Sequence, residues 1–437
     1  MPRADFRLTV FPVLAAIAFT SPAALAAPGD PVDVAGIRAV VESACRIDPT
    51  DVDAVRAALP GSRLLDARID QAGGRPGRSY HRVLVPGGGE WVLTKLFPGG
   101  RLRRVTVEWR RPSPSGARPE LSANADAGCR ITEGRRIVYK DGRAETLLIL
   151  SADLTSVADE QPLNPPVPPA AAARGKPTLP RVAVVDTGVN YTLAPFQGRL
   201  ARDAAGDLIG YDFWDMDTRP FDVDTARSPF FPLHHGTAVA SVLLREAPDV
   251  ALVPYRYPRP DMARFGDLVS HAADHGVVIV NMAMGSDSRS DWQAFETAAK
   301  SRPDMLFIVS AGNDGRDLDR EPVFPAALGL ANVLSVTSSD EWGRLAPGSN
   351  WGAASVDVMT PGENIPVIDH RGAAGKASGS SFAVPRVTAL AARLAAKHLD
   401  WKGPEIKRAV VKRARATDGG RRVRYGWIPD PTDDFEK

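Results

Sequence analysis

The chain has 437 residues, a length that predicts two or three domains. Hydrophobic residues make up 44% and charged residues 24%, which excludes wholesale disorder, collagen-like repeats and a long coiled coil. The 54 basic and 52 acidic residues leave a net charge of +2, so no overall field attracts nucleic acid or an anionic membrane surface. Any partner must therefore be recognised by a local site.

Residues 1–26 have the pattern of a secretory signal peptide. Arg3 and Arg7 precede an apolar run over 8–19, and small residues close the segment. The run is shorter than the roughly 20 apolar residues that a membrane-spanning helix needs. We therefore expect cleavage and export, with a secreted or periplasmic product and no stable membrane anchor. A buried N-terminal helix is the alternative.

The two cysteines, Cys45 and Cys129, are too few for a disulfide scaffold and lack the paired spacing of a structural zinc site. In an oxidising compartment a disulfide between them is expected, because disulfides form and persist there. Two free buried thiols are the alternative. Both cysteines precede the proline-rich segment, so they concern the N-terminal domain alone.

Residues 28–160 are expected to form a smaller α+β domain with an antiparallel sheet. The apolar spacing over 37–59 predicts two short helices, and the alternation of apolar and polar residues over 102–109 predicts a strand with one buried face. The antiparallel sheet is expected to end near Leu154. The other predicted strands are 81–85, 91–96, 136–139 and 146–150, the last two joined by a turn at Asp141-Gly142.

Residues 161–180 hold seven prolines around a run of alanines. That composition forms no packed core and predicts an extended linker. Beyond it, over 181–430, short apolar runs alternate with segments that can be helices. Such runs are typical of strands buried on both faces, so we expect an α/β fold with a parallel sheet between helix layers, and then an acidic tail over 431–437. The predicted strands are 181–185, 250–255, 277–282, 305–310 and 333–337.

Four short motifs carry candidate chemistry. They are Asp186 before Thr187-Gly188, His235 before Gly236-Thr237, Asn313 after Ser310-Ala311-Gly312, and Ser381 at the end of Ser378-Gly379-Ser380-Ser381. Taken alone, each has a structural alternative: a strand-end carboxylate, a structural histidine, a turn asparagine and a helix-capping serine. The Asp-Thr-Gly stretch also describes an aspartic peptidase loop, but that enzyme would need a second such loop or a homodimer.

Taken together, the motifs and their chain order resemble the subtilisin family of serine peptidases over residues 180–428. The resemblance does not extend to residues 28–160. The family's His-Gly-Thr motif selects His235 rather than its neighbour His234. Ser381 is selected because it directly precedes Phe-Ala-Val-Pro, where the family has Ser-Met-Ala-x-Pro.

The resemblance implies a subtilisin-like fold and a serine endopeptidase. Ser381 would attack the scissile carbonyl, His235 would take its proton, and Asp186 would orient and stabilise the imidazole. The amide of Asn313 and the backbone N–H of Ser381 would form the oxyanion hole. No cofactor is implied.

Two segments resemble the substrate-binding segments of the family, one of which would pair with an extended polypeptide as an added strand. They are Ala283, Met284 and Gly285, which resemble the stretch that pairs with the substrate backbone, and Ser310, Ala311 and Gly312, which resemble the wall of the pocket that holds the substrate residue before the cleaved bond. The alternative is that both are simply the ends of core strands.

Metal sites are not expected. Many members of the family carry a calcium loop after the helix of the histidine, whereas here residues 243–249 lead almost directly into the next predicted strand. The acidic stretch 212–224 could bind a hard cation, but we expect solvated loop carboxylates there.

Exported members of the family usually carry a propeptide, and residues 28–160 occupy that place. They are longer than usual and carry no recognised propeptide motif. We hypothesise a pro-region that contacts the cleft and is removed by self-cleavage within 156–180. A retained accessory domain is the alternative. The rival function for the whole chain is a catalytically silent, peptidase-like protein that binds a peptide or a partner.

Overall fold

The computed structural model describes residues 34–47, 59, 61–72, 74–113, 116–170, 179–417 and 421–433. The chain forms two compact units: one comprises Met1–Arg136 and Leu148–Asp159, and the other comprises Ile137–Leu147 and Glu160–Lys437. The predicted signal peptide and the second predicted N-terminal helix lie outside the described residues. Within these described ranges, no helix is both long and apolar enough to cross a membrane.

A helix packed on a sheet forms the core of the N-terminal part. Val105 and Val107 of β4 pack with α1. The prediction of a single buried face for this strand is wrong, because Thr106 and Glu108 on the other face are buried as well. Eight strands, each beside its chain neighbour, make the sheet, and the pairs from β1 to β6 are antiparallel. The elements are α1 (Val34–Arg46), β1 (Arg63–Ala72), β2 (Arg75–Leu84), β3 (Glu90–Leu96), β4 (Arg104–Arg111), β5 (Arg118–Asp126), β6 (Ile131–Lys140), β7 (Arg143–Leu150) and β8 (Val157–Pro162).

The predicted turn at Asp141-Gly142 is confirmed. Both residues have positive φ, 50° and 82°, as a tight hairpin turn between right-twisted strands requires. The sheet extends beyond the predicted end near Leu154, because β8 forms its last strand. Pro162 closes that strand at the edge of the sheet, where a missing N–H removes no ladder hydrogen bond.

Of the two alternatives for the cysteines, the structure has the disulfide. Cys45 lies in α1 and Cys129 lies in the turn between β5 and β6, with their Cα atoms 5.9 Å apart. The bond spans 84 positions of the chain and ties the helix to the sheet that it covers.

The first half of the proline-rich segment is packed, although its composition predicted a linker without a core. Leu163 and Asn164 are buried. The hydroxyl of Tyr191 donates to the carbonyl of Pro165 at 2.7 Å. Extended proline-rich backbone leaves its carbonyls free to accept, so a segment that builds no core can still dock. Residues 171–178 lie outside the described part of the chain.

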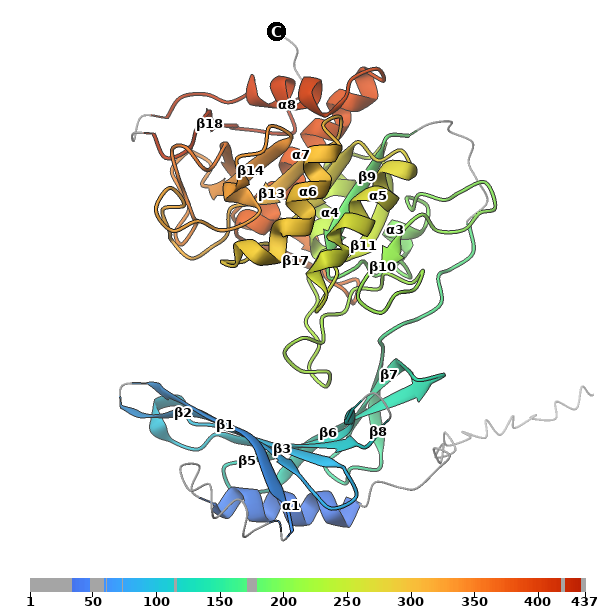
Figure 1. Ribbon diagram of the computed structural model, residues 1–437, viewed down its shortest axis with the longest axis vertical. Helices are drawn as coiled ribbons and strands as arrows, with labels where there is room; N and C mark the ends of the chain where they lie inside the picture. Colours follow the sequence, from blue (N-terminus) through green and yellow to red (C-terminus); the bar gives the residue numbers. More distant parts are fainter. Residues whose placement is uncertain are drawn as a thin grey trace, which may run out of the picture. The chain divides into compact units, whose positions relative to one another are not determined.

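A parallel sheet forms the centre of the second unit (Figure 1), as the sequence predicted. Its strand order is β10-β11-β9-β12-β13-β14-β15-β18. The strands are β9 (Arg181–Asp186), β10 (Tyr211–Asp212), β11 (Ala251–Arg256), β12 (Ile279–Met282), β13 (Leu306–Ser310), β14 (Val333–Ser339), β15 (Val358–Pro361) and β18 (Gly426–Trp427); a separate hairpin joins β16 (Ile365–Ile368) and β17 (Ala374–Ala377). All five predicted strands are present, and the unpredicted ones are short.

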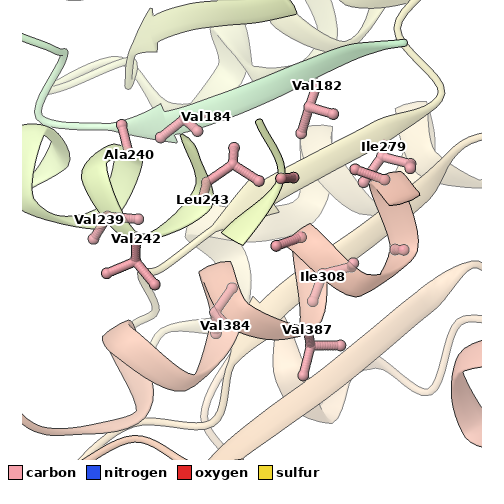
Figure 2. Packing of buried hydrophobic residues seen from close by; sticks show 14 of the residues in the cluster. Val182, Val184, Val239, Ala240, Val242, Leu243, Ile279, Ile308, Val384 and Val387 are labelled. Atoms are coloured by element: carbon pink, nitrogen blue, oxygen red, sulfur yellow. The ribbon is translucent and has the colours of Figure 1, made fainter. Parts of the chain in front are cut away.

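Helices cover both faces of this sheet, which confirms the predicted layers. The side chains of α4 and α7 pack with those of β9, β12 and β13 on one face (Figure 2). Helix α8 adds to this face, and α5 and α6 pack on the other. The helices are α3 (Ala194–Gln197), α4 (Gly236–Glu246), α5 (Phe265–Asp274), α6 (Gln293–Ser301), α7 (Ser380–Lys397) and α8 (Gly403–Val411).

The strand order reverses at β9. The chain continues from β9 to β10 and β11 on one side, and later to β12 on the other. Connections that leave in opposite directions open a crevice at the carboxyl ends of the strands, which is where α/β proteins bind ligands. Asp186 is the last residue of β9, so the fold places the first candidate residue at this crevice.

Candidate active site

Asp186 and His235 are in direct contact. His235 directly precedes α4, and its Nδ1 lies 2.8 and 3.0 Å from the two carboxylate oxygens of Asp186. The backbone N–H of Thr187 donates to the same carboxylate at 2.8 Å. Because a carboxylate only accepts, Nδ1 of His235 carries the hydrogen, and Nε2 of the neutral ring is left as an acceptor.

The pKa of His235 is raised from its ordinary value. Burial alone would lower this pKa, but the charge and hydrogen bond of Asp186, together with the charge of Asp222, outweigh burial. A raised pKa makes the imidazole a stronger base, and the nearby carboxylate stabilises the imidazolium that proton uptake produces.

The two serines that begin α7 have different surroundings. Ser380 is fully buried, and its hydroxyl lies 2.8 Å from the hydroxyl of Ser310 and 2.9 Å from Oδ1 of Asn313. Ser381 is partly exposed, and no hydrogen bond joins its hydroxyl to another described residue. The next side chain, Phe382, has its ring centre 5.8 Å from that of His235. The start of α7 therefore lies beside the histidine.

Asn313 is fixed through one end of its amide. Its Oδ1 accepts hydrogen bonds from the backbone N–H and the hydroxyl of Ser380, both at 2.9 Å. Its amide nitrogen has no hydrogen-bond partner among the described residues, and the residue is exposed. An oriented and unpaired amide N–H is the kind of donor that can stabilise a developing oxyanion.

A buried residue that the sequence analysis missed, Asn350, holds the Asn313 loop in place. Its side chain donates to the carbonyl of Ala311 at 2.8 Å and accepts from the backbone N–H groups of Asp314 and Arg316, both at 2.9 Å. Its position after Gly348-Ser349 was the only sequence signal, and that signal reads as an ordinary turn.

We expect Asn350→Ala to lower the free energy of unfolding by about 2–4 kcal/mol, because three hydrogen bonds are lost around buried backbone groups. Thermal and urea denaturation measure this loss. Ser349→Ala is the matched control: Ser349 is buried beside Asn350, but its hydroxyl makes no hydrogen bond with the described residues. Equal stability of the two variants would contradict the assignment.

The two candidate substrate-binding segments lie side by side at the same sheet edge. Asp186 ends β9, and the segments follow the neighbouring strands β12 and β13. Ala283, Ser310 and Ala311 are buried, whereas Met284, Gly285 and Gly312 are partly or fully exposed. A Cβ atom on Gly312 would lie 2.6 Å from the amide nitrogen of Asn350, so this position requires glycine.

His234 is partly buried. Its Nδ1 lies 2.5 Å from the carbonyl oxygen of Asp222, and its ring stacks on His370 with centres 3.5 Å apart. Burial and the neighbouring His234 lower the pKa of His370.

The expectation of solvated carboxylates over 212–224 is wrong for Asp212, Asp217 and Asp222, which are buried. Asp212 accepts from Arg256 at 2.9 Å, and burial raises the pKa of Asp212 to about 6 in spite of that partner. Asp217 pairs with Arg143 at 2.9 Å. In the part of the chain that the structure describes, no group of three His, Cys, Asp or Glu side chains could hold a metal ion.

Comparison with known proteins identifies the family. The subtilase family model matches residues 180–427. A thermophilic serine proteinase of Bacillus sp. (strain AK1) is 29% identical over 262 residues, which cover 56% of this chain and 59% of that protein. The cell wall-associated protease of Bacillus subtilis (strain 168) is 27% identical over 57% of this chain and 28% of its own length. The chain thus spans less than two thirds of these relatives.

Among solved structures, a cold-adapted subtilisin-like serine proteinase matches 57% of this chain and 88% of its own, with 24% identity and a TM-score of 0.47. The family match itself covers more than half of the chain and includes all four candidate motifs. The chain belongs to the subtilase family.

Proposed function

We propose that the protein is an exported serine endopeptidase that hydrolyses peptide bonds in extended polypeptides. The proposed triad is Asp186, His235 and Ser381, and the proposed oxyanion hole combines the Asn313 amide with the backbone N–H of Ser381. The observation that carries the proposal is the Asp186–His235 hydrogen bond beside the start of α7, where the hydroxyl of Ser381 is unpaired. Family membership and the names of the relatives support it.

In the proposed reaction, Nε2 of His235 takes the hydroxyl proton of Ser381 as the serine oxygen attacks the scissile carbonyl. The carbonyl electrons move onto the oxyanion, which accepts from the Asn313 amide. The imidazolium, stabilised by Asp186, then gives its proton to the leaving amine, and an acyl-enzyme remains. A water molecule then attacks the acyl-enzyme by the same steps, with His235 as the base, which releases the carboxylic acid product and restores Ser381.

The substrate would bind as an added strand along Ala283–Gly285, and Ser310–Gly312 would form the wall of the pocket for the residue before the cut. The support is their position at the ends of neighbouring strands, one and two strands away from the strand that ends in Asp186. Backbone pairing gives affinity with little demand on sequence. We further propose that residues 28–160 act as a pro-region that contacts this cleft and is released by cleavage within 156–180.

Labelling with a fluorophosphonate probe tests the proposed nucleophile. The reagent phosphonylates an activated serine, so peptide mapping of the folded protein is expected to find the label on Ser381 and not on the buried Ser380. Absence of label from folded and processed protein would instead favour a silent protein that only binds peptides.

A further inference from the structure

The start of α4 lacks a cap of its own. The first backbone N–H groups of a helix have no partner within the helix, and a buried N–H without a partner is costly. His235 stands at the N-cap position, but its ring is bonded to Asp186 and gives the helix no side-chain cap. The following residues, Gly236 and Thr237, are buried, so water does not replace the missing acceptors.

A carboxylate from another part of the chain supplies the acceptors. Asp222 is 1% exposed; its Oδ1 accepts from the backbone N–H of His235 at 3.1 Å, and its Oδ2 accepts from that of Thr237 at 2.9 Å. The N–H of Gly236 donates to the hydroxyl oxygen of Thr187 at 2.9 Å, and this hydroxyl in turn donates to Asp222 at 2.5 Å. All three N–H groups are thereby satisfied, and the negative charge lies at the positive end of the helix dipole.

We propose that Asp222 is a positioning residue of the active site, which fixes the place and direction of the His235 ring; this inference rests on the proposed function. Asp186 holds the ring through Nδ1, and Asp222 holds the backbone of the same residue. Thr187 connects the two carboxylates, since its N–H donates to Asp186 and its hydroxyl donates to Asp222. A misplacement of about 1 Å at a reacting group can cost about 100-fold in rate.

Asp222 also acts on His235 by its charge. Burial lowers the pKa of His235, Asp186 raises it, and the charge of Asp222 adds to the effect of Asp186. The other titratable side chains at this point are the stacked rings of His234 and His370, the first bonded to the Asp222 carbonyl. Removing the charge of Asp222 while keeping its size therefore changes both the geometry and the basicity of His235.

The test is Asp222→Asn. The amide of this variant has one acceptor oxygen, which can serve only one of the two backbone N–H groups. Its NH₂ group then faces the second N–H, and two donors oppose each other. We expect kcat on a peptide substrate to fall about 10- to 100-fold, with KM changed by less than about twofold. We also expect the acidic limb of the kcat/KM profile to move to lower pH, because the pKa of His235 falls. Asp224→Asn is the matched control: its carboxylate bonds Tyr257 and the N–H of Ala226, and activity should be unchanged.

A structural role alone would lower the melting temperature and leave kcat and the acidic limb in place, which would overturn the proposal. NMR titration of the His235 ring in the Ser381→Ala background reads the pKa without any proteolysis, so it separates this proposal from failure of the proposed function. An unshifted titration in Asp222→Asn overturns the proposal.

If Asp222→Asn does not fold, Thr187→Val is the second variant: it removes the hydroxyl link to Asp222 and the acceptor of the Gly236 N–H, and it keeps the Asp222 carboxylate. A kcat loss of about 3- to 10-fold at constant KM supports the proposal, and an unchanged kcat overturns it.

Discussion

Replacing Ser381 by alanine is expected to lower kcat for peptide hydrolysis by at least about 10⁴-fold, because no other group forms the acyl-enzyme. The fold should be unaffected. Ser381 is partly exposed and its hydroxyl has no hydrogen-bond partner among the described residues, so removal of the hydroxyl leaves no partner group unsatisfied. Hydrolysis of a quenched fluorescent peptide and thermal denaturation measure the two effects.

Ser378→Ala is the control for this variant. Ser378 is exposed in the same turn, and its hydroxyl accepts only from the backbone N–H of Asn364 at 2.9 Å, so the rate should equal that of the wild type. Residual hydrolysis by Ser381→Ala within about tenfold of the wild type would mean that another nucleophile operates.

Comparison of Ser381→Ala with the wild type also tests the pro-region hypothesis. Intact-mass measurement should find residues 28–160 attached in Ser381→Ala and absent from the active protein. An unchanged mass in the active protein would show a retained accessory domain.

Asp186→Asn is expected to lower kcat by about 10⁴-fold with little change in the fold. The amide has nearly the shape of the carboxylate, but its NH₂ donates where Asp186 only accepts. Nδ1 of His235 must then become the acceptor, which places the ring hydrogen on Nε2. A ring in that tautomer cannot take the proton of Ser381.

The pH dependence gives a second readout. His235 acts as a base only when neutral, so activity is lost as the pH falls through its pKa. Asp186 raises that pKa against the effect of burial, so the remaining activity of Asp186→Asn should persist to lower pH than that of the wild type. A rate within about tenfold of the wild type, or an acidic limb that does not move, would exclude this role. Asp224→Asn again serves as the charge-matched control.

The strands around the site were predictable because their signals are local. The run that ends at Asp186 is apolar throughout, as a strand buried on both faces must be, and β10, β15 and β18 were missed because each is too short to carry such a run. Each of the four motifs is a short contiguous stretch of sequence, so the candidate site could be named before its geometry was known.

Asp222 and Asn350 could not be predicted in the same way, because what each does depends on contacts across the fold. Asp222 lies in an acidic stretch that is typical of solvated loops, yet it is buried and bonds the backbone of His235, 13 positions beyond it. Asn350 holds a loop 34 to 39 positions earlier in the chain. Leu163 and Asn164 were misjudged for the opposite reason: composition describes what a segment can build alone and says nothing of a surface on which it docks.

The late position of Ser381 in the chain also determines when the proposed activity can arise. Residues of the candidate site come from β9 through to α7, and α7 covers one face of the sheet with Val384 and Val387 (Figure 2). A ribosome that has not yet reached α7 has made a chain with neither the proposed nucleophile nor that cover. Synthesis order alone therefore keeps every copy that ends before Ser381 without the proposed activity, independently of any inhibitor.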